Sequence, residues 1–154
     1  MIEAGAQAPD FTLPDQDGQL VALAGFRVRP VLLVFYPADF SPVCTDQLSV
    51  YQESLSEFEC RGVQLLAISV DSAFCHNAFR SHLGVTMPLL ADFHPKGEVA
   101  RAYGLWSEKH GVAGRALVLI DPDGVVEWAH RAPALEYPGT DLIFQKLARF
   151  GIPS

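Results

Sequence analysis

The segment from Pro37 to Cys44 holds the residues of this chain best suited to chemistry. Ser41 followed by Pro42 is typical of a helix N-cap and of the first helical position. Cys44 then takes the third position of that helix, where backbone N–H groups lack intrahelical partners and the helix dipole is positive. Both features stabilise a thiolate, which is the nucleophilic form of cysteine. The spacing therefore predicts a cysteine nucleophile at Cys44.

The elements that position this cysteine alternate between strand and helix. Residues 30–36 form an apolar, β-branched run that predicts a buried strand ending before Pro37. A helix is expected from Ser41 to about Cys60, followed by a second buried strand over 63–70 and a second helix over 71–83. The other expected elements are a hairpin of 11–13 and 20–23, an extended segment at 87–90, a short helix over 97–103, strands at 116–121 and 125–131, and a closing helix over 140–150.

This order of elements predicts the fold class. Alternating strands and helices followed by a hairpin and a helix are typical of an α/β protein with a mixed central sheet flanked by helices. Residues 1–154 are expected to form one domain, since 154 residues with 49% hydrophobic and 19% charged side chains suit a single core. In such folds reactive residues lie beyond the carboxyl ends of strands, which is where Cys44 is expected.

Charge and cysteine content narrow the possible partners and the compartment. The net charge of −7 argues against nucleic acid or an anionic membrane as a partner. Residues 1–5 lack the basic and apolar regions of a secretory signal, and no apolar run is long enough to span a bilayer. Three cysteines, an odd number, indicate the reducing cytoplasm and reactive chemistry in place of a disulfide scaffold. The five histidines show no metal-ligand spacing, so we expect neither a metal nor a cofactor.

The segment around the cysteine resembles the active site of the peroxiredoxin family. The pattern Pro37-x-x-x-Ser41-x-x-Cys44 is similar to the motif of these proteins, in which a proline and a threonine or serine precede the peroxidatic cysteine. Residues 35–40 and the N-terminal stretch 5–13 also resemble the family. Overall the chain is most similar to the short alkyl hydroperoxide reductase E-like branch. The resemblance implies a thioredoxin-like fold with an N-terminal extension.

Two later stretches extend the resemblance over most of the chain. Residues 67–72 and 111–121 match the family, and the second places Arg115 at the position of its active-site arginine. The family reduces peroxides through a cysteine sulfenic acid. The resemblance therefore implies a thiol-dependent peroxidase that acts on H₂O₂ and organic hydroperoxides, with Arg115 beside the reactive sulfur.

Ionisation of the thiol alone does not account for such chemistry. A thiol with a pKa of about 8.5 is roughly 3% ionised at pH 7, and lowering the pKa to about 6 gains only some thirtyfold. Preorganised donors must supply the rest, because losing one typically costs about 10²–10³ in rate. We expect Arg115 to present its guanidinium to the thiolate and the peroxide oxygens. The hydroxyl of Ser41 and the backbone N–H groups of Val43 and Cys44 are expected to bind the peroxide, and Pro37 to shield the thiolate from water.

The other two cysteines bear on how a sulfenic acid would be resolved. Cys75 follows the strand predicted at 63–70, so it is expected at the same edge of the sheet as Cys44. Since a sulfenic acid condenses with a nearby thiol, Cys75 is the candidate resolving cysteine. The alternative is a one-cysteine cycle, in which an external thioredoxin- or glutaredoxin-like protein or a low-molecular-weight thiol reduces the sulfenic acid. The resemblance offers no other resolving position, since Ser49 stands five residues after the first cysteine. Cys60 is expected to be a structural or solvent-edge thiol.

Other functions on the same fold stay open at this point. A thioredoxin-type disulfide oxidoreductase is disfavoured because the chain has no Cys-x-x-Cys motif. A redox sensor, a chaperone-like holdase and a structural domain with an inert cysteine are the alternatives. The resemblance also implies a homodimer formed through loops around the active site. The aromatic residues expected near those loops are Phe40, Phe74, Phe93 and Trp106.

Overall fold

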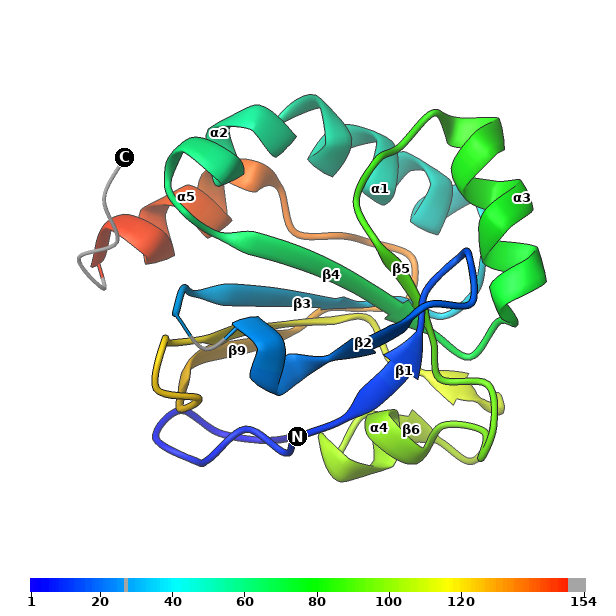
Figure 1. Cartoon of the computed structure of the whole chain (residues 1–154), viewed down its shortest axis with the longest axis horizontal. Helices are drawn as coiled ribbons and strands as arrows, with labels where there is room; N and C mark the ends of the chain where they lie inside the picture. The colour runs from blue at the N-terminus through cyan, green and yellow to red at the C-terminus, as the bar shows by residue number, and fades with distance from the viewer. Residues whose placement is uncertain (27, 150–154) are drawn as a thin grey trace.

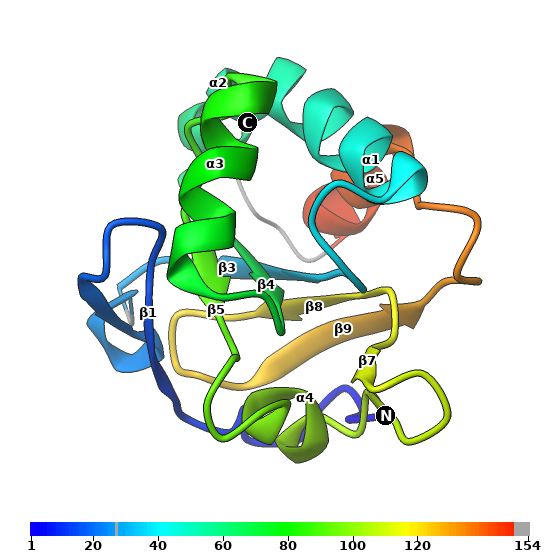
Figure 2. The ribbon, with the colours of Figure 1, turned by 90° about the vertical axis from the view of Figure 1, so that its right-hand side faces the viewer.

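Strand β3 (Val31–Phe35) lies at the centre of a five-stranded mixed sheet in the computed structural model, which describes residues 1–26 and 28–149. The strand order is β5-β4-β3-β8-β9, and β3 pairs in parallel with β4 and antiparallel with β8. Figure 1 labels β3, β4, β5 and β9, and Figure 2 labels β8 between β3 and β9. The α/β class with a mixed sheet is therefore confirmed. The remaining strands of this sheet are β4 (Gln64–Ser69), β5 (Leu89–Ala91), β8 (Ala116–Ile120) and β9 (Val126–Arg131).

Both faces of this sheet are covered, which explains why β3 is a continuous apolar run with every residue buried. One face packs under the helices α1, α2, α3 and α5, and the other packs on the N-terminal segment and α4 (Figure 2). Alternate residues of β3 point to opposite faces, so Leu32 and Val34 join the first core while Leu33 and Phe35 join the second. The α-helices among the described residues are α1 (Pro42–Glu53), α2 (Leu55–Cys60), α3 (Ala73–Leu83), α4 (Glu98–Ala102) and α5 (Thr140–Arg149).

The prediction of a single helix from Ser41 to Cys60 is wrong, because the helix is interrupted at Ser54 and forms α1 and α2. Ser54 has φ −99° and ψ 6°, and its N–H donates to Tyr51 O, three residues back, which tightens the last turn of α1. The carbonyl of Ser54 then accepts from Phe58 N–H and starts α2. The two short helices still share one buried face, which is the periodicity that the sequence displays.

Helix α3, expected over 71–83, is capped at both ends. Ser72 is the N-cap, and its side chain accepts a hydrogen bond from Cys75 N–H. Gly84 ends the helix with a φ of +70°, a left-handed conformation that glycine adopts without a Cβ penalty. The expected end of the last helix at residue 150 lies outside the described residues.

Two small hairpins and a 3₁₀ helix complete the described part of the fold. The expected N-terminal hairpin is present, and the hydrogen bond from Leu89 N–H to Gln16 Oε1 links its turn to β5. The 3₁₀ helix over 23–26 and the small hairpin over 106–113 were not predicted. In chain order these elements are β1 (Thr12–Pro14), β2 (Leu20–Ala22), the 3₁₀ helix η1 (Leu23–Phe26), β6 (Trp106–Ser107) and β7 (Val112–Ala113). Within residues 1–26 and 28–149, we find no helix with the length and apolar character needed to cross a membrane.

Candidate active site

Cys44 lies in the first turn of α1, directly beyond the carboxyl end of β3. The loop 37–41 joins the two elements, and Ser41 has the extended backbone of an N-cap residue, with φ −69° and ψ 145°. Pro42 takes the first helical position and Cys44 the third, as the sequence predicts. The Cys44 side chain is fully buried between α1 and the sheet. The sulfur therefore sits at the positive end of a twelve-residue helix.

Arg115 reaches this sulfur from the neighbouring antiparallel strand. Residue 115 directly precedes β8, whose first residue, Ala116, pairs with Phe35 at the end of β3. That register places the arginine beside the start of α1. The guanidinium is buried with 2% of the residue exposed, and its Nη2 donates to Cys44 Sγ at 3.2 Å. A buried cation is costly unless it is paired, and this contact places the sulfur where the guanidinium can stabilise negative charge.

A chain of hydrogen bonds fixes the orientation of Arg115. Its Nη1 donates to Gln47 Oε1, and its Nε and Nη2 donate to Ala134 O at 3.3 and 3.0 Å. The amide of Gln47 donates in turn to the Tyr51 hydroxyl at 3.2 Å, and that hydroxyl donates to Pro138 O at 2.7 Å. Burial raises the pKa of Tyr51 to about 12, so the phenol stays neutral and keeps its proton for this bond.

Sequence reasoning missed Gln47 and Tyr51 as residues of the site. Gln47 lies three positions after Cys44, so both project from the same face of α1. A fully buried amide on an otherwise apolar face needs hydrogen-bond partners. That was the available signal, although the sequence alone does not name the partner.

Ser41 caps the helix by its backbone but not by its side chain. Its hydroxyl donates to Ala38 O at 3.1 Å, and no side-chain cap bond is formed. The first bond into the helix runs from Thr45 N–H to Ser41 O at 2.9 Å. The amides of Val43 and Cys44 precede that bond, so they belong to the helix start whose donors have no intrahelical acceptor.

Pro37 shares a cavity with Arg115. It is half-buried, and the cavity has a volume of about 390 Å³. Most of the other lining residues are small or apolar, which leaves room beside the guanidinium for an organic group. These residues are Ser107, His110, Val112, Ala113, Gly114, Arg131, Ala132, Pro133 and Ala134.

Cys75 occupies a different environment from Cys44. It lies in the first turn of α3, with its sulfur 3.9 Å from Asp71 Oδ1. Burial, followed by the negative charges of Asp39 and Asp71, raises the pKa of the Cys75 thiol to about 12. All three cysteines are free, and Cys60 is exposed at the end of α2.

One group of potential metal ligands occurs among the described residues. The nearest side-chain donor atoms of Asp39, Asp71 and Cys75 lie within 4.8 Å of one another. Their carboxylates already accept hydrogen bonds from Tyr36 and Ser69, among others. We therefore assign these residues to a hydrogen-bonded network and not to a metal centre.

Comparison with known proteins identifies the family of this chain. The model of the AhpC/TSA family matches residues 4–129. Alkyl hydroperoxide reductase E of Mycobacterium tuberculosis is 43% identical over 130 residues, which cover 84% of this chain and 85% of that protein. Peroxiredoxin 2 of Thermoplasma acidophilum is 39% identical over 136 residues, which cover 84% of this chain and 67% of that protein.

Solved structures show the same fold over almost the whole chain. The AhpC protein of Enterococcus faecalis superposes with a TM-score of 0.90 at 25% identity, covering 98% of this chain and 93% of that one. Peroxidoxin BcpB of Mycobacterium tuberculosis superposes with a TM-score of 0.84 at 26% identity, and each chain is covered completely. The chain therefore belongs to the AhpC/TSA family, the peroxiredoxins, which are thiol-dependent peroxidases with a thioredoxin-like fold.

Proposed function

We propose that this peroxiredoxin reduces H₂O₂ and organic hydroperoxides with Cys44 as the peroxidatic cysteine. The observation that carries the proposal is the 3.2 Å contact between Arg115 Nη2 and Cys44 Sγ at a helix start. The thiolate attacks the terminal oxygen of the hydroperoxide, and the O–O bond breaks as the S–O bond forms. The sulfur becomes a sulfenic acid, and the departing alkoxide takes a proton from solvent to leave as an alcohol, or as water from H₂O₂.

Arg115 acts on both the sulfur and the leaving oxygen in this proposal. Its guanidinium is held by Gln47 and Ala134, so it does not need to reorganise when the charge moves from sulfur to oxygen. Preorganised donors of this kind are each worth about 10²–10³ in rate. Because the cation is buried, its field is weakly screened by water.

Ser41, with the helix amides, binds the peroxide. The Ser41 hydroxyl donates to Ala38 O, which leaves its oxygen lone pairs able to accept the terminal O–H of the hydroperoxide. The amides of Val43 and Cys44 supply donors for the peroxide oxygens. Pro37 covers the thiolate, and the cavity of about 390 Å³ beside it receives the organic group of a larger hydroperoxide.

The sulfenic acid of Cys44 is reduced, in our proposal, by an external thiol. Cys75 is the intramolecular candidate, but burial and the charges of Asp39 and Asp71 raise the pKa of its thiol to about 12, so little of it is thiolate at pH 7. The nucleophile for sulfenic acid is the thiolate, so this environment disfavours attack by Cys75. A thioredoxin- or glutaredoxin-like protein or a low-molecular-weight thiol is therefore the proposed reductant.

We also propose a homodimer and a cytoplasmic location. Phe40, Phe74 and Phe93 are 50%, 89% and 56% exposed, and Phe74 and Phe93 line one apolar cavity of about 480 Å³. Such exposed aromatic area supports association through the loops around the site. Trp106 supports it less, because it is half-buried with the Arg101 guanidinium 4.3 Å from its ring. A catalytic thiolate needs a reducing compartment, which supports the cytoplasm.

A single-turnover experiment tests the peroxidase proposal. Reduced protein is mixed with one equivalent of H₂O₂, tryptophan fluorescence is followed by stopped flow, and the residual peroxide is assayed. Fast stoichiometric consumption with a sulfenic acid on Cys44, lost in Cys44→Ser, is the expected result. Stoichiometric oxidation without turnover in the presence of thiols would instead indicate a redox sensor. If the protein consumes no H₂O₂, the remaining functions are a chaperone-like holdase or a structural domain with an inert cysteine.

A further inference from the structure

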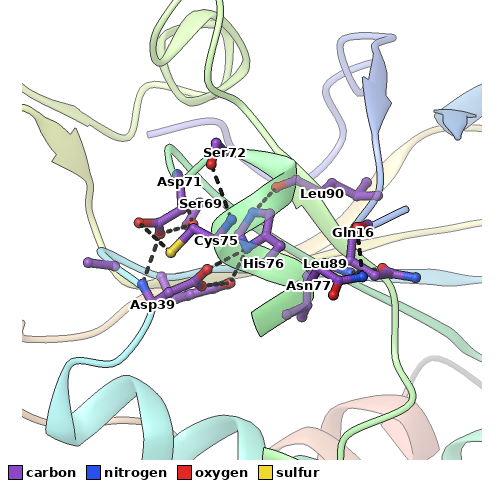
Figure 3. A network of polar contacts seen from close by, with 12 residues as sticks. Gln16, Asp39, Ser69, Asp71, Ser72, Cys75, His76, Asn77, Leu89 and Leu90 are labelled. Atoms are coloured by element: carbon purple, nitrogen blue, oxygen red, sulfur yellow. Dashed lines mark hydrogen bonds and ion pairs between the residues drawn. The ribbon is translucent and has the colours of Figure 1, made fainter. Parts of the chain in front are cut away.

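A buried network of hydrogen bonds fixes the loop between β3 and α1, and this network contains neither Cys44 nor Arg115. Asp39 lies in this loop, between Pro37 and Ser41. Figure 3 shows Asp39 beside Asp71 and His76, which come from the turn after β4 and from α3. The Asp39 N–H donates to Asp71 Oδ2 at 2.8 Å, while its carboxylate accepts from the Tyr36 hydroxyl at 2.6 Å. The backbone and the side chain of Asp39 are therefore both engaged.

His76 completes this network and constrains its protons. Its Nε2 lies 3.0 Å from Leu90 O, and a carbonyl only accepts, so Nε2 carries a hydrogen. Its Nδ1 lies 2.7 Å from Asp39 Oδ2, so the contact between carboxylate and imidazole must hold a second proton. The side chains of Asp39 and His76 are both completely buried. The pair therefore links the loop to α3 and, through Leu90, to β5.

The loop that His76 holds has an unfavourable backbone. Phe40, which follows Asp39, is the one non-glycine residue with positive φ among those described, at +65°. A large side chain adopts this left-handed conformation only where the surroundings impose it. The next residue is Ser41, whose hydroxyl faces back to Ala38 O across the same turn. The position of Ser41 therefore depends on what holds Asp39.

We propose that His76, acting through Asp39, is a positioning residue that holds Pro37 and Ser41 in place for the peroxide. The inference rests on the proposed function of Cys44. Arg115, which donates to the sulfur, is held independently by Gln47 and Ala134. The groups that face the pair are Tyr36 from the end of β3, Ser69 and Asp71 from the end of β4, Cys75 from α3 and the Leu90 carbonyl from β5.

Because different residues hold the loop and the guanidinium, two reactions of the Cys44 sulfur, with peroxide and with an alkylating agent, should respond differently to loss of His76. Removing the imidazole leaves the Asp39 carboxylate buried next to Asp71, so the loop must shift to let in water or a proton. The peroxide then loses its alignment by Ser41 and Pro37. A small neutral alkylating agent such as iodoacetamide needs only the thiolate, which Arg115 still stabilises. The proposal therefore predicts a loss of peroxide reactivity without a loss of alkylation.

Substitution of Asp39 provides a rescue. The amide of Asp39→Asn can accept from Tyr36 through its oxygen and donate to the neutral imidazole of His76 through its nitrogen. All three contacts of the pair are then possible without a buried charge. In the double variant with His76→Phe, Asp39→Asn removes the carboxylate that has lost its imidazole partner and would otherwise displace the loop.

The test compares the two rate constants of Cys44 in the full-length protein. His76→Phe, Asp39→Asn, their double variant and wild type are reduced, and the second-order rate constants with H₂O₂ and iodoacetamide are measured at 15 °C. We expect His76→Phe to lose about tenfold or more toward H₂O₂, within the range for a misplaced binding group, and to stay within about twofold toward iodoacetamide. Asp39→Asn should stay near wild type, and the double variant should regain part of the loss.

Controls separate this inference from stability and from the proposed function. Asp92→Asn changes another buried carboxylate, which accepts from the Val99 and Ala100 amides of α4, and should leave both rate constants unchanged. His76→Gln replaces the phenylalanine variant if that protein does not fold. Equal peroxide rates in His76→Phe and wild type, or a parallel fall of both reactions, would overturn the positioning role. A wild type without fast peroxide reactivity would overturn the proposed function itself.

Discussion

Arg115 Nη2 and Cys44 Sγ lie 3.2 Å apart although 71 residues separate them in sequence. The pairing of Phe35 with Ala116 brings them together, because it aligns the end of β3 with the start of β8. A shift of one residue in that register would turn the arginine to the opposite face of the sheet. The contact between the guanidinium and the sulfur is thus a direct consequence of sheet register.

Replacing Arg115 tests how much this contact contributes. Arg115→Ala removes the donor to the sulfur, so the rate constant with H₂O₂ should fall about 10²–10³-fold. Arg115→Lys keeps the charge without the planar fork and should recover only part of that loss. Stopped-flow fluorescence gives the rates, and circular dichroism checks the fold. Arg101→Ala, which removes an exposed guanidinium paired with Glu108, is the matched control and should react like wild type. An unchanged rate in a folded Arg115→Ala protein would reject the assignment.

Gln47 should matter for reactivity although it does not contact the sulfur. Gln47→Leu leaves Arg115 Nη1 and the Tyr51 hydroxyl without this partner, so the guanidinium loses part of its support. We expect a fall of about tenfold in the rate with H₂O₂, which corresponds to about 1.4 kcal/mol. Unlike loss of His76, this change should also slow alkylation, because it acts on the cation that stabilises the thiolate.

Gln52→Leu provides the comparison for that experiment. Gln52 is a glutamine of the same helix whose side chain bonds to Thr86 at the surface. Its loss should leave both reactions of Cys44 near wild-type rates. If Gln47→Leu and Gln52→Leu behave alike, the orientation of Arg115 does not depend on Gln47.

Local signals in the sequence were sufficient for the elements around the site. The apolar run of β3 and the Ser41-Pro42 pair place Cys44 correctly, because capping and burial depend on near neighbours. The break of the first helix at Ser54 escaped prediction, since the apolar face continues across it. No residue type at that point forbids a helix, and tertiary packing decides it.

The polar partners of the site were harder to foresee. Gln47 and His76 each bond to a residue distant in sequence, and a sequence does not show which strand register or helix contact will join them. The one visible sign is a polar residue placed on a buried helix face. Arg115 was predicted from the family resemblance alone, because the residues around it do not distinguish it from an ordinary arginine next to a strand.

Cys75→Ser should leave the catalytic cycle intact. If an external thiol reduces the Cys44 sulfenic acid, turnover of H₂O₂ with a saturating thiol reductant should stay within about twofold of wild type, since the reaction then depends on the incoming thiolate. Wild-type protein treated with one equivalent of H₂O₂ and analysed by mass spectrometry should contain sulfenic acid at Cys44. Cys60→Ser is the control, because that thiol is exposed. A disulfide between Cys44 and Cys75 in most molecules would establish the intramolecular route instead.

The environment of Cys75 predicts an unusual pH dependence of its alkylation. In a Cys44→Ser/Cys60→Ser protein, Cys75 is the only thiol, and its pKa of about 12 means that the thiolate fraction rises about tenfold per pH unit from pH 7 to 10. A thiol with a pKa of about 8.5 would instead level off above pH 9. Iodoacetamide labelling followed by mass spectrometry measures this profile. Adding Asp71→Asn removes one of the charges that raise the pKa, so labelling at pH 8 should accelerate. A plateau near pH 9 in the protein with Asp71 intact would show that Cys75 forms a thiolate readily, and it would restore Cys75 as the resolving nucleophile.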